Sequence, residues 1–168
     1  MKTLIVIDMQ NDFVTGPLGT EEARAIVPKI KEKIKKYREA GNRVIFTRDT
    51  HYANYLETKE GKMLPVKHCV YNTDGWQIVD GLEFEGCEYI NKTSFGWNNW
   101  DNRNYYEDIE LVGVCTDICV ISNALILKAQ FPEDIDIIVD ASCCAGCTPE
   151  LHRAALDVMR SCQIIVKE

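Results

Sequence analysis

Residues 111–120 read LVGVCTDICV, a run in which an apolar, strand-like segment passes into a helical pattern. The strand pattern breaks at Gly113, and a helix is predicted from Thr116 onward. Cys119 is therefore expected near the amino end of a helix, where the positive end of the helix dipole favours a thiolate. An open α/β fold holds a nucleophile at this place, facing the carboxyl end of a strand.

Short apolar runs and longer amphipathic runs alternate over the rest of the chain. Strands are predicted at residues 3–7, 42–47, 88–91, 109–114, 135–139 and 163–166. Helices are predicted at residues 21–41 and 116–130, and from Pro149 onward, after the capping residue Thr148. Strands that alternate with helices form right-handed crossovers and a sheet covered on both faces. We predict one α/β domain over residues 1–168, a three-layer αβα (Rossmann-like) fold with a six-stranded, mostly parallel sheet.

The stretch from residue 51 to residue 86 is polar and irregular, with a short helical turn predicted at residues 76–79. A loop of this length is uncommon in a compact domain unless it serves a function. The stretch contains two histidines, several aromatic residues, Glu57 and Glu60. We therefore expect it to build and cover a site.

Composition excludes several classes of protein. The 168 residues carry a formal net charge of −7, which disfavours nucleic acid as a partner because nucleic acid requires a basic face. No apolar run approaches the roughly 18 residues of a membrane span, and the chain enters a strand directly rather than through a signal peptide. We expect a cytoplasmic protein that acts on a small molecule, and the sequence leaves open whether it forms a homo-oligomer.

Cysteine is abundant, with eight residues at positions 69, 87, 115, 119, 143, 144, 147 and 162. In a chain without an export signal, reduced thiols are expected rather than a disulfide framework. Cys144 and Cys147 have the spacing of a zinc or redox pair, but a structural zinc site needs two more ligands and no second such pair exists. We predict that Cys143, Cys144 and Cys147 lie in a loop, with a metal or redox role as the alternative.

Charged side chains are placed at the ends of three other predicted strands. Asp8 follows the first strand, where it could act as a general base or cap a turn. Lys92 follows the third strand, where it could hold a thiolate or an oxyanion and pair with Asp8, or simply be solvated. The carboxyl ends of parallel strands meet at one edge of a sheet, so these groups are expected near Cys119.

Asp49 and His51 follow the second strand, and His68 lies 17 residues further on. Residues i and i+2 of an extended chain share a face, so the pair could hold a first-row metal ion together with His68. Two hydrogen-bonded histidines in a loop are the alternative. Trp97 and Trp100 could line a pocket next to Lys92 or belong to the core, and we expect His152 at the surface or half-buried.

Taken together, these residues resemble the isochorismatase-like cysteine hydrolases, and among them the nicotinamidases. The resemblance covers nearly the whole chain in family order. It is carried by the stretches IDMQNDF (7–13), TRDTH (47–51), LPVKHC (64–69), NKTSF (91–95) and VGVCTDICV (112–120). It implies a catalytic triad of Asp8, Lys92 and Cys119, and a cis peptide bond between Val114 and Cys115. It also implies an oxyanion hole formed by the amides of Cys115 and Cys119.

For a nicotinamidase, the resemblance further implies a divalent metal ion that binds the pyridine nitrogen of the substrate. Asp49, His51 and His68 correspond to three of its ligands. The fourth family ligand is a histidine or a glutamate; no histidine lies between residues 51 and 68, so Glu60 is preferred over Glu57. Zinc is the expected ion, with iron or manganese as alternatives, and Phe13 is expected to stack near the ring of the substrate.

The implied activity is amide hydrolysis through a thioester on Cys119, with nicotinamide as the leading substrate. One alternative is a metal-free relative that hydrolyses another small amide, a ureido compound or a vinyl ether. A second, from another class, is a non-catalytic thiol-redox or metal-binding protein, which the eight cysteines suggest. Metal content distinguishes the metal-free alternative from a nicotinamidase. The thiol-redox alternative predicts that Cys143, Cys144 or Cys147 is alkylated before Cys119, which mapping of the most reactive thiol can test.

Overall fold

The structure is a computed structural model that describes residues 1–100, 107–131 and 135–168. Its centre is a six-stranded sheet in which every neighbouring pair is parallel, in the order β3-β2-β1-β4-β5-β6. The strands are β1 (Thr3–Ile7), β2 (Arg43–Asp49), β3 (Glu88–Lys92), β4 (Ile109–Val114), β5 (Ile137–Ala145) and β6 (Ile165–Lys167). The predicted α/β fold is confirmed, and the sheet is parallel throughout.

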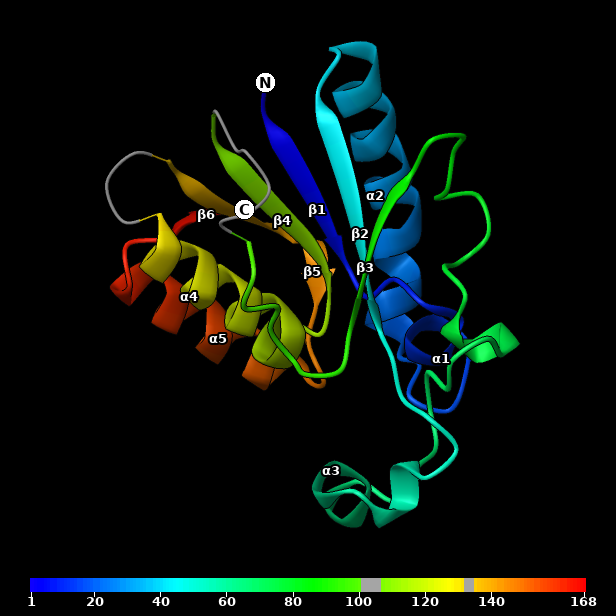
Figure 1. Cartoon of the computed structure of the whole chain (residues 1–168). Coiled ribbons are helices and arrows are strands. Elements are labelled where there is room, and N and C mark those ends of the chain that lie inside the picture. Colours follow the sequence, from blue (N-terminus) through cyan, green and yellow to red (C-terminus); the bar gives the residue numbers. More distant parts are fainter. Residues whose placement is uncertain (101–106, 132–134) are drawn as a thin grey trace.

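Helices cover both faces of the sheet, which gives three layers (Figure 1). The helix α2 (Glu21–Glu39) lies on one face, and α4 (Ile121–Gln130) and α5 (Pro149–Ser161) lie on the other. Two shorter helices, α1 (Asn11–Val14) and α3 (Lys59–Met63), follow the carboxyl ends of β1 and β2. Among the described residues, no helix is both long and apolar enough to cross a bilayer.

The apolar strands are explained by this layering. In β1, Leu4 and Val6 pack in the core on the α2 side, whereas Ile5 and Ile7 pack in the core on the side of α4 and α5. Successive side chains of a strand point to opposite faces, so a strand buried on both faces must be apolar at every position. The predicted helix starts are also confirmed: the side chains of Thr20 and Thr148 accept hydrogen bonds from the backbone of the first turns of α2 and α5.

Two local predictions are corrected by the structure, whereas the β4 strand has its predicted bounds, Ile109–Val114. The irregularity expected at Gly113 is a left-handed backbone conformation (φ +120°) that lies against β1 within the strand. The next helical residues, Thr116–Val120, form a π-helical turn before α4 begins. The 51–86 stretch is less irregular than predicted: it contains α3 and two 3₁₀ turns, Tyr55–Glu57 and Asp74–Trp76, the second slightly before the predicted turn.

The predicted cysteine loop is also wrong in part. The β5 strand continues to Ala145, so Cys143 and Cys144 are buried strand residues, and Cys147 alone is exposed beyond it. The pairing of β4 with β5 shifts register between Leu111 and Gly113 and then resumes, which prolongs β5. Small thiol side chains fit this buried position, where they behave as apolar groups.

Candidate active site

The four predicted strand ends meet at the carboxyl edge of the sheet. Asp8 follows β1, Asp49 and Lys92 end β2 and β3, and Cys119 lies in the π-helical turn after β4. In the strand order, β1 has β2 on one side and β4 on the other, so the chain changes direction of winding there. Open parallel sheets bind their ligands at this kind of switch point.

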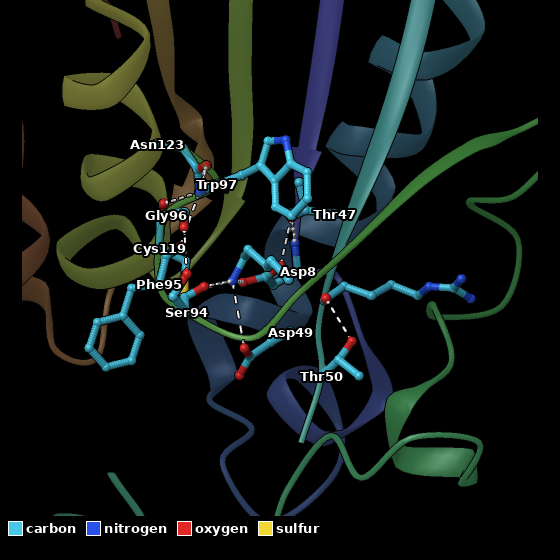
Figure 2. A network of polar contacts seen from close by, with 12 residues as sticks. Asp8, Thr47, Asp49, Thr50, Ser94, Phe95, Gly96, Trp97, Cys119 and Asn123 are labelled. Carbon is cyan, nitrogen blue, oxygen red and sulfur yellow. Dashed lines mark hydrogen bonds and ion pairs between the residues drawn. The ribbon is translucent and has the colours of Figure 1, made fainter. Parts of the chain in front are cut away.

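Asp8 is buried and has a left-handed backbone conformation (φ 48°), which is uncommon for a residue other than glycine. Thr47 of β2 holds it from two directions (Figure 2). The Thr47 hydroxyl donates to Oδ1 of Asp8 at 2.6 Å and accepts from the amide of Asp8 at 3.1 Å. Burial, which is only partly offset by Lys92, raises the pKa of Asp8 above its ordinary value.

Lys92 is fully buried and lies between the other members of the predicted triad. Its Nζ atom is 2.6 Å from Oδ2 of Asp8 and 3.6 Å from Sγ of Cys119. The same ammonium donates to the carbonyl of Ser94 at 3.2 Å and is 3.7 Å from Oδ1 of Asp49. Burial opposes the charge of Lys92, but the facing carboxylates outweigh it and raise its pKa, so the ammonium remains charged.

Cys119 is buried beside the two charged members of the predicted triad. Burial and the nearby carboxylate of Asp8 raise the pKa of Cys119 well above its ordinary value, although Lys92 acts in the opposite direction. A raised pKa disfavours the thiolate, so a base that takes the thiol proton would assist attack. Asp8, whose pKa is also raised, lies on the other side of Lys92.

The chain around Cys119 is fixed by the close approach of β1 and β4. A Cβ on Gly113 would come within 2.1 Å of the carbonyl oxygen of Ile7, so only glycine fits. The Val114–Cys115 peptide bond is cis, as the resemblance implies, and Cys115 is half-buried next to the turn that holds Cys119.

Four potential metal ligands gather beside the triad: Asp49, His51, Glu60 and His68. One ligand atom from each lies within 4.8 Å of all the others. Nε2 of His51 is 3.0 Å from Oδ2 of Asp49 and 3.5 Å from Oε1 of Glu60, and Nε2 of His68 is 3.7 and 4.0 Å from the same two atoms. Bonds of about 2.0–2.2 Å to a central ion give separations of this size, so the group fits a tetrahedral divalent metal.

The surroundings of these ligands favour metal binding. Nδ1 of His68 is hydrogen-bonded to the carbonyl of Val66 at 2.8 Å, which leaves Nε2 for an ion. The Gln10 side chain accepts from the amide of Asp49 at 2.7 Å and donates to its carbonyl at 2.9 Å. Burial opposes ionisation of Asp49, but the nearby imidazoles of His51 and His68 and the charge of Lys92 outweigh it and lower its pKa.

The remaining predicted residues divide into those near the site and those outside it. The Phe13 ring lies 5.4 Å from the ring of His68, beside the metal ligands, and Trp97 is half-buried on the loop after Lys92. Trp100 is fully buried in the core, and Glu57 is exposed and outside the ligand group. His152 is half-buried, as expected.

Three residues that support the site received no role from the sequence. Gln10 and Thr47 hold Asp49 and Asp8, and Asn123 joins the helix of Cys119 to the loop after Lys92. Gln10 and Thr47 lie inside stretches that carry the family resemblance, so their place in the motif was an available signal. Asn123 had none, because its partners are up to 28 residues away.

A comparison with protein-family models matches residues 2–167 to the isochorismatase domain. The chain belongs to the isochorismatase family. A pyrazinamidase of Pyrococcus horikoshii, solved in complex with zinc, superposes with a TM-score of 0.87 at 29% identity, covering 99% of this chain and 98% of that chain. The nicotinamidase/pyrazinamidase of Mycobacterium tuberculosis is 25% identical over 197 residues, covering 98% of this chain and 97% of that protein.

Family membership makes this chain a hydrolase of the isochorismatase type with a candidate metal site. It leaves the substrate open, because the relatives differ in activity. A protein of Arabidopsis thaliana that is named a probable inactive nicotinamidase is 28% identical over 176 residues, covering 94% of this chain and 87% of that protein. The argument for a particular reaction therefore depends on the residues of this chain.

Proposed function

We propose that this protein is a metal-assisted cysteine amidohydrolase that cleaves a small aromatic amide, with nicotinamide as the leading substrate. The observation that carries the proposal is the position of the buried Lys92 ammonium. It contacts the Asp8 carboxylate and the Cys119 thiol, and it lies 3.7 Å from a carboxylate of the metal-ligand group. A nucleophile, a base and a candidate substrate-binding metal site are thus adjacent.

In the first half of the reaction, Asp8 takes the proton of the Cys119 thiol, and Lys92 stabilises the resulting thiolate. The thiolate attacks the amide carbonyl carbon, and the backbone amides of Cys115 and Cys119 hold the oxygen as it becomes negative. Asp8 then gives its proton to the departing nitrogen, which leaves as ammonia, and a thioester to Cys119 remains.

In the second half, Asp8 takes a proton from a water molecule that attacks the thioester carbonyl. The carbon–sulfur bond breaks, Asp8 returns its proton to the Cys119 thiolate, and the product acid loses its proton to solvent and leaves as a carboxylate. The raised pKa of Asp8 suits both proton transfers, because a carboxyl group of ordinary pKa is a weaker base at neutral pH.

Asp49, His51, Glu60 and His68 would hold the divalent ion, which supplies a Lewis-acidic binding point for the ring nitrogen of the substrate. The imidazole-rich donor set favours zinc, with iron or manganese also compatible. Phe13 packs against His68, where its ring would face an aromatic substrate bound at the ion.

Ammonia release from nicotinamide tests this proposal, with the metal content of the purified wild type measured alongside. We expect hydrolysis by the wild type and none by Cys119→Ala with the same metal content. Well-folded, metal-loaded wild type that releases no ammonia would exclude nicotinamide. A wild type that is active without metal would instead favour the metal-free hydrolysis of another small amide, a ureido compound or a vinyl ether.

A further inference from the structure

Asn123 is a buried residue on α4, one helical turn after Cys119, and its whole hydrogen-bonding capacity is used (Figure 2). Its Nδ2 atom donates to the carbonyls of Cys119 at 2.8 Å and Phe95 at 3.2 Å. Its Oδ1 atom accepts from the amide of Trp97 at 2.9 Å and from the indole of Trp100 at 3.2 Å. A side-chain amide has two donors and an acceptor with two lone pairs, so Asn123 is saturated.

The loop that Asn123 holds also touches the proposed catalytic groups. Residues 94–97, which we term the wall segment, begin at Ser94, whose carbonyl accepts from the ammonium of Lys92. At Gly96 the wall segment lies so close to α4 that a Cβ would come within 2.4 Å of the side chain of Ile126. In Figure 2 the indole of Trp97 extends from the wall segment to the side on which Thr47 and Asp8 are drawn, whereas the Phe95 ring points to the opposite side.

We propose that Asn123 is a positioning residue for the reaction. It fixes the wall segment to the helix that carries Cys119, so that the Ser94 carbonyl stays on Lys92 and the Trp97 indole borders the substrate pocket. The placement of Trp97 at the pocket rests on the proposed function. The contacts of Asn123 with both elements do not, because they join the thiol-bearing turn to the wall segment whatever the substrate.

Asn123 binds the wall segment at two points, the carbonyl of Phe95 and the amide of Trp97. Ser94 and Phe95 are exposed, whereas Trp97 is partly buried and packs against the core on the side of α4. At Gly96 the chain lies directly against α4, and Asn123 makes its hydrogen bonds to the residues on both sides of that glycine. A displacement of about 1 Å in a positioning group can reduce turnover by about 100-fold, so a loosened wall segment has a measurable effect.

The test uses alkylation of Cys119, mapped by mass spectrometry of its peptide, with iodoacetamide and with an N-phenyl iodoacetamide. The small reagent reports on the thiol, and the aromatic reagent also reports on the aromatic wall. Asn123→Ser keeps a donor for the carbonyl four residues earlier but is too short to reach the wall segment. We expect the wild type to react faster with the aromatic reagent than with iodoacetamide. Asn123→Ser should reduce this preference by about 10-fold and lower kcat/KM for the amide by about 10- to 100-fold, and a wild type without the preference would overturn the proposal.

The matched control is Gln130→Leu, which removes a hydrogen bond of 2.9 Å from the same helix to the same loop, at the carbonyl of Asn98. It should leave the reagent ratio unchanged. If Asn123→Ser is insoluble, Gly96→Val tests the same docking without altering Asn123, and it should lose the aromatic preference too. An unchanged ratio in Asn123→Ser or Gly96→Val, or an equal loss in Gln130→Leu, would overturn the proposal.

The reagent ratio can be measured without amide turnover, so the two proposals fail separately. A wild type that hydrolyses no amide while Asn123→Ser loses the aromatic preference would remove the proposed function and leave the positioning role in place. Hydrolysis by the wild type with an unchanged reagent ratio in Asn123→Ser would support the proposed function and remove the positioning role.

Discussion

Replacement of Lys92 by methionine tests how the site balances its buried charges. The ammonium is 2.6 Å from the Asp8 carboxylate, and both side chains are fully buried. Removing one partner of such a pair leaves the other charge unpaired and costs about 3–5 kcal/mol of unfolding free energy. For a chain of this length, that loss lowers Tm by about 6–20 °C. Without Lys92, the pKa of the unpaired Asp8 carboxyl rises further, so this carboxyl binds a proton more readily in the folded state than in the unfolded chain. Protonation removes the unpaired charge, so the loss of unfolding free energy in Lys92→Met should shrink as pH falls.

Urea unfolding followed by circular dichroism measures these changes, and the double variant Asp8→Asn/Lys92→Met is the control. With both charges gone, the double variant should recover most of the lost stability. Neither variant should hydrolyse the amide, because Lys92→Met lacks the ammonium and the double variant lacks both the ammonium and the Asp8 base. Two results would refute this account of the pair: a single variant as stable as the double variant, or a Lys92→Met protein that retains wild-type turnover.

Three further predictions concern the support of the site and of the sheet. Gln10→Leu should weaken zinc binding by about 10- to 100-fold in a competitive chelator titration, because Gln10 holds the backbone of Asp49; unchanged affinity would contradict this role. Gly113→Ala should fail to give soluble folded protein, since its Cβ would overlap the carbonyl of the neighbouring strand; a wild-type Tm would show that the strands can separate there. Glu110→Gln should be less stable than the wild type at neutral pH, because burial raises the pKa of Glu110 but the ion pair with Lys33 outweighs it and lowers the pKa. The difference in unfolding free energy, measured by urea unfolding, should close as pH falls below about 4.5, and a difference that stays constant would contradict this role.

The sequence predicts the fold well because its main signals are local. Apolar strands, capping residues such as Thr148, and glycines at turns each reflect a neighbouring backbone requirement. The catalytic candidates were also predictable, because the carboxyl ends of parallel strands necessarily meet at one edge. The resemblance to a known family then assigned roles to Asp8, Lys92 and Cys119.

Features that depend on distant partners could not be predicted in this way. The extension of β5 over Cys143 and Cys144 is set by pairing with β4, and Asp140 and Ser142 within it conceal the strand pattern. The raised pKa of Cys119 follows from its burial and from the nearby Asp8 carboxylate, which only the folded chain brings together. Asn123 has no local signature because its role arises from contacts across the fold.

The central claim, that Cys119 forms a thioester with the acyl group of the substrate, is tested most directly by trapping that intermediate. Wild-type protein is mixed with nicotinamide, quenched in acid within milliseconds to seconds, and digested for mass mapping. We predict a nicotinoyl group on the Cys119 peptide that appears before free nicotinate and is released by hydroxylamine. Nicotinate that forms while the Cys119 peptide stays unmodified, together with continued turnover by Cys119→Ala, would contradict the claim.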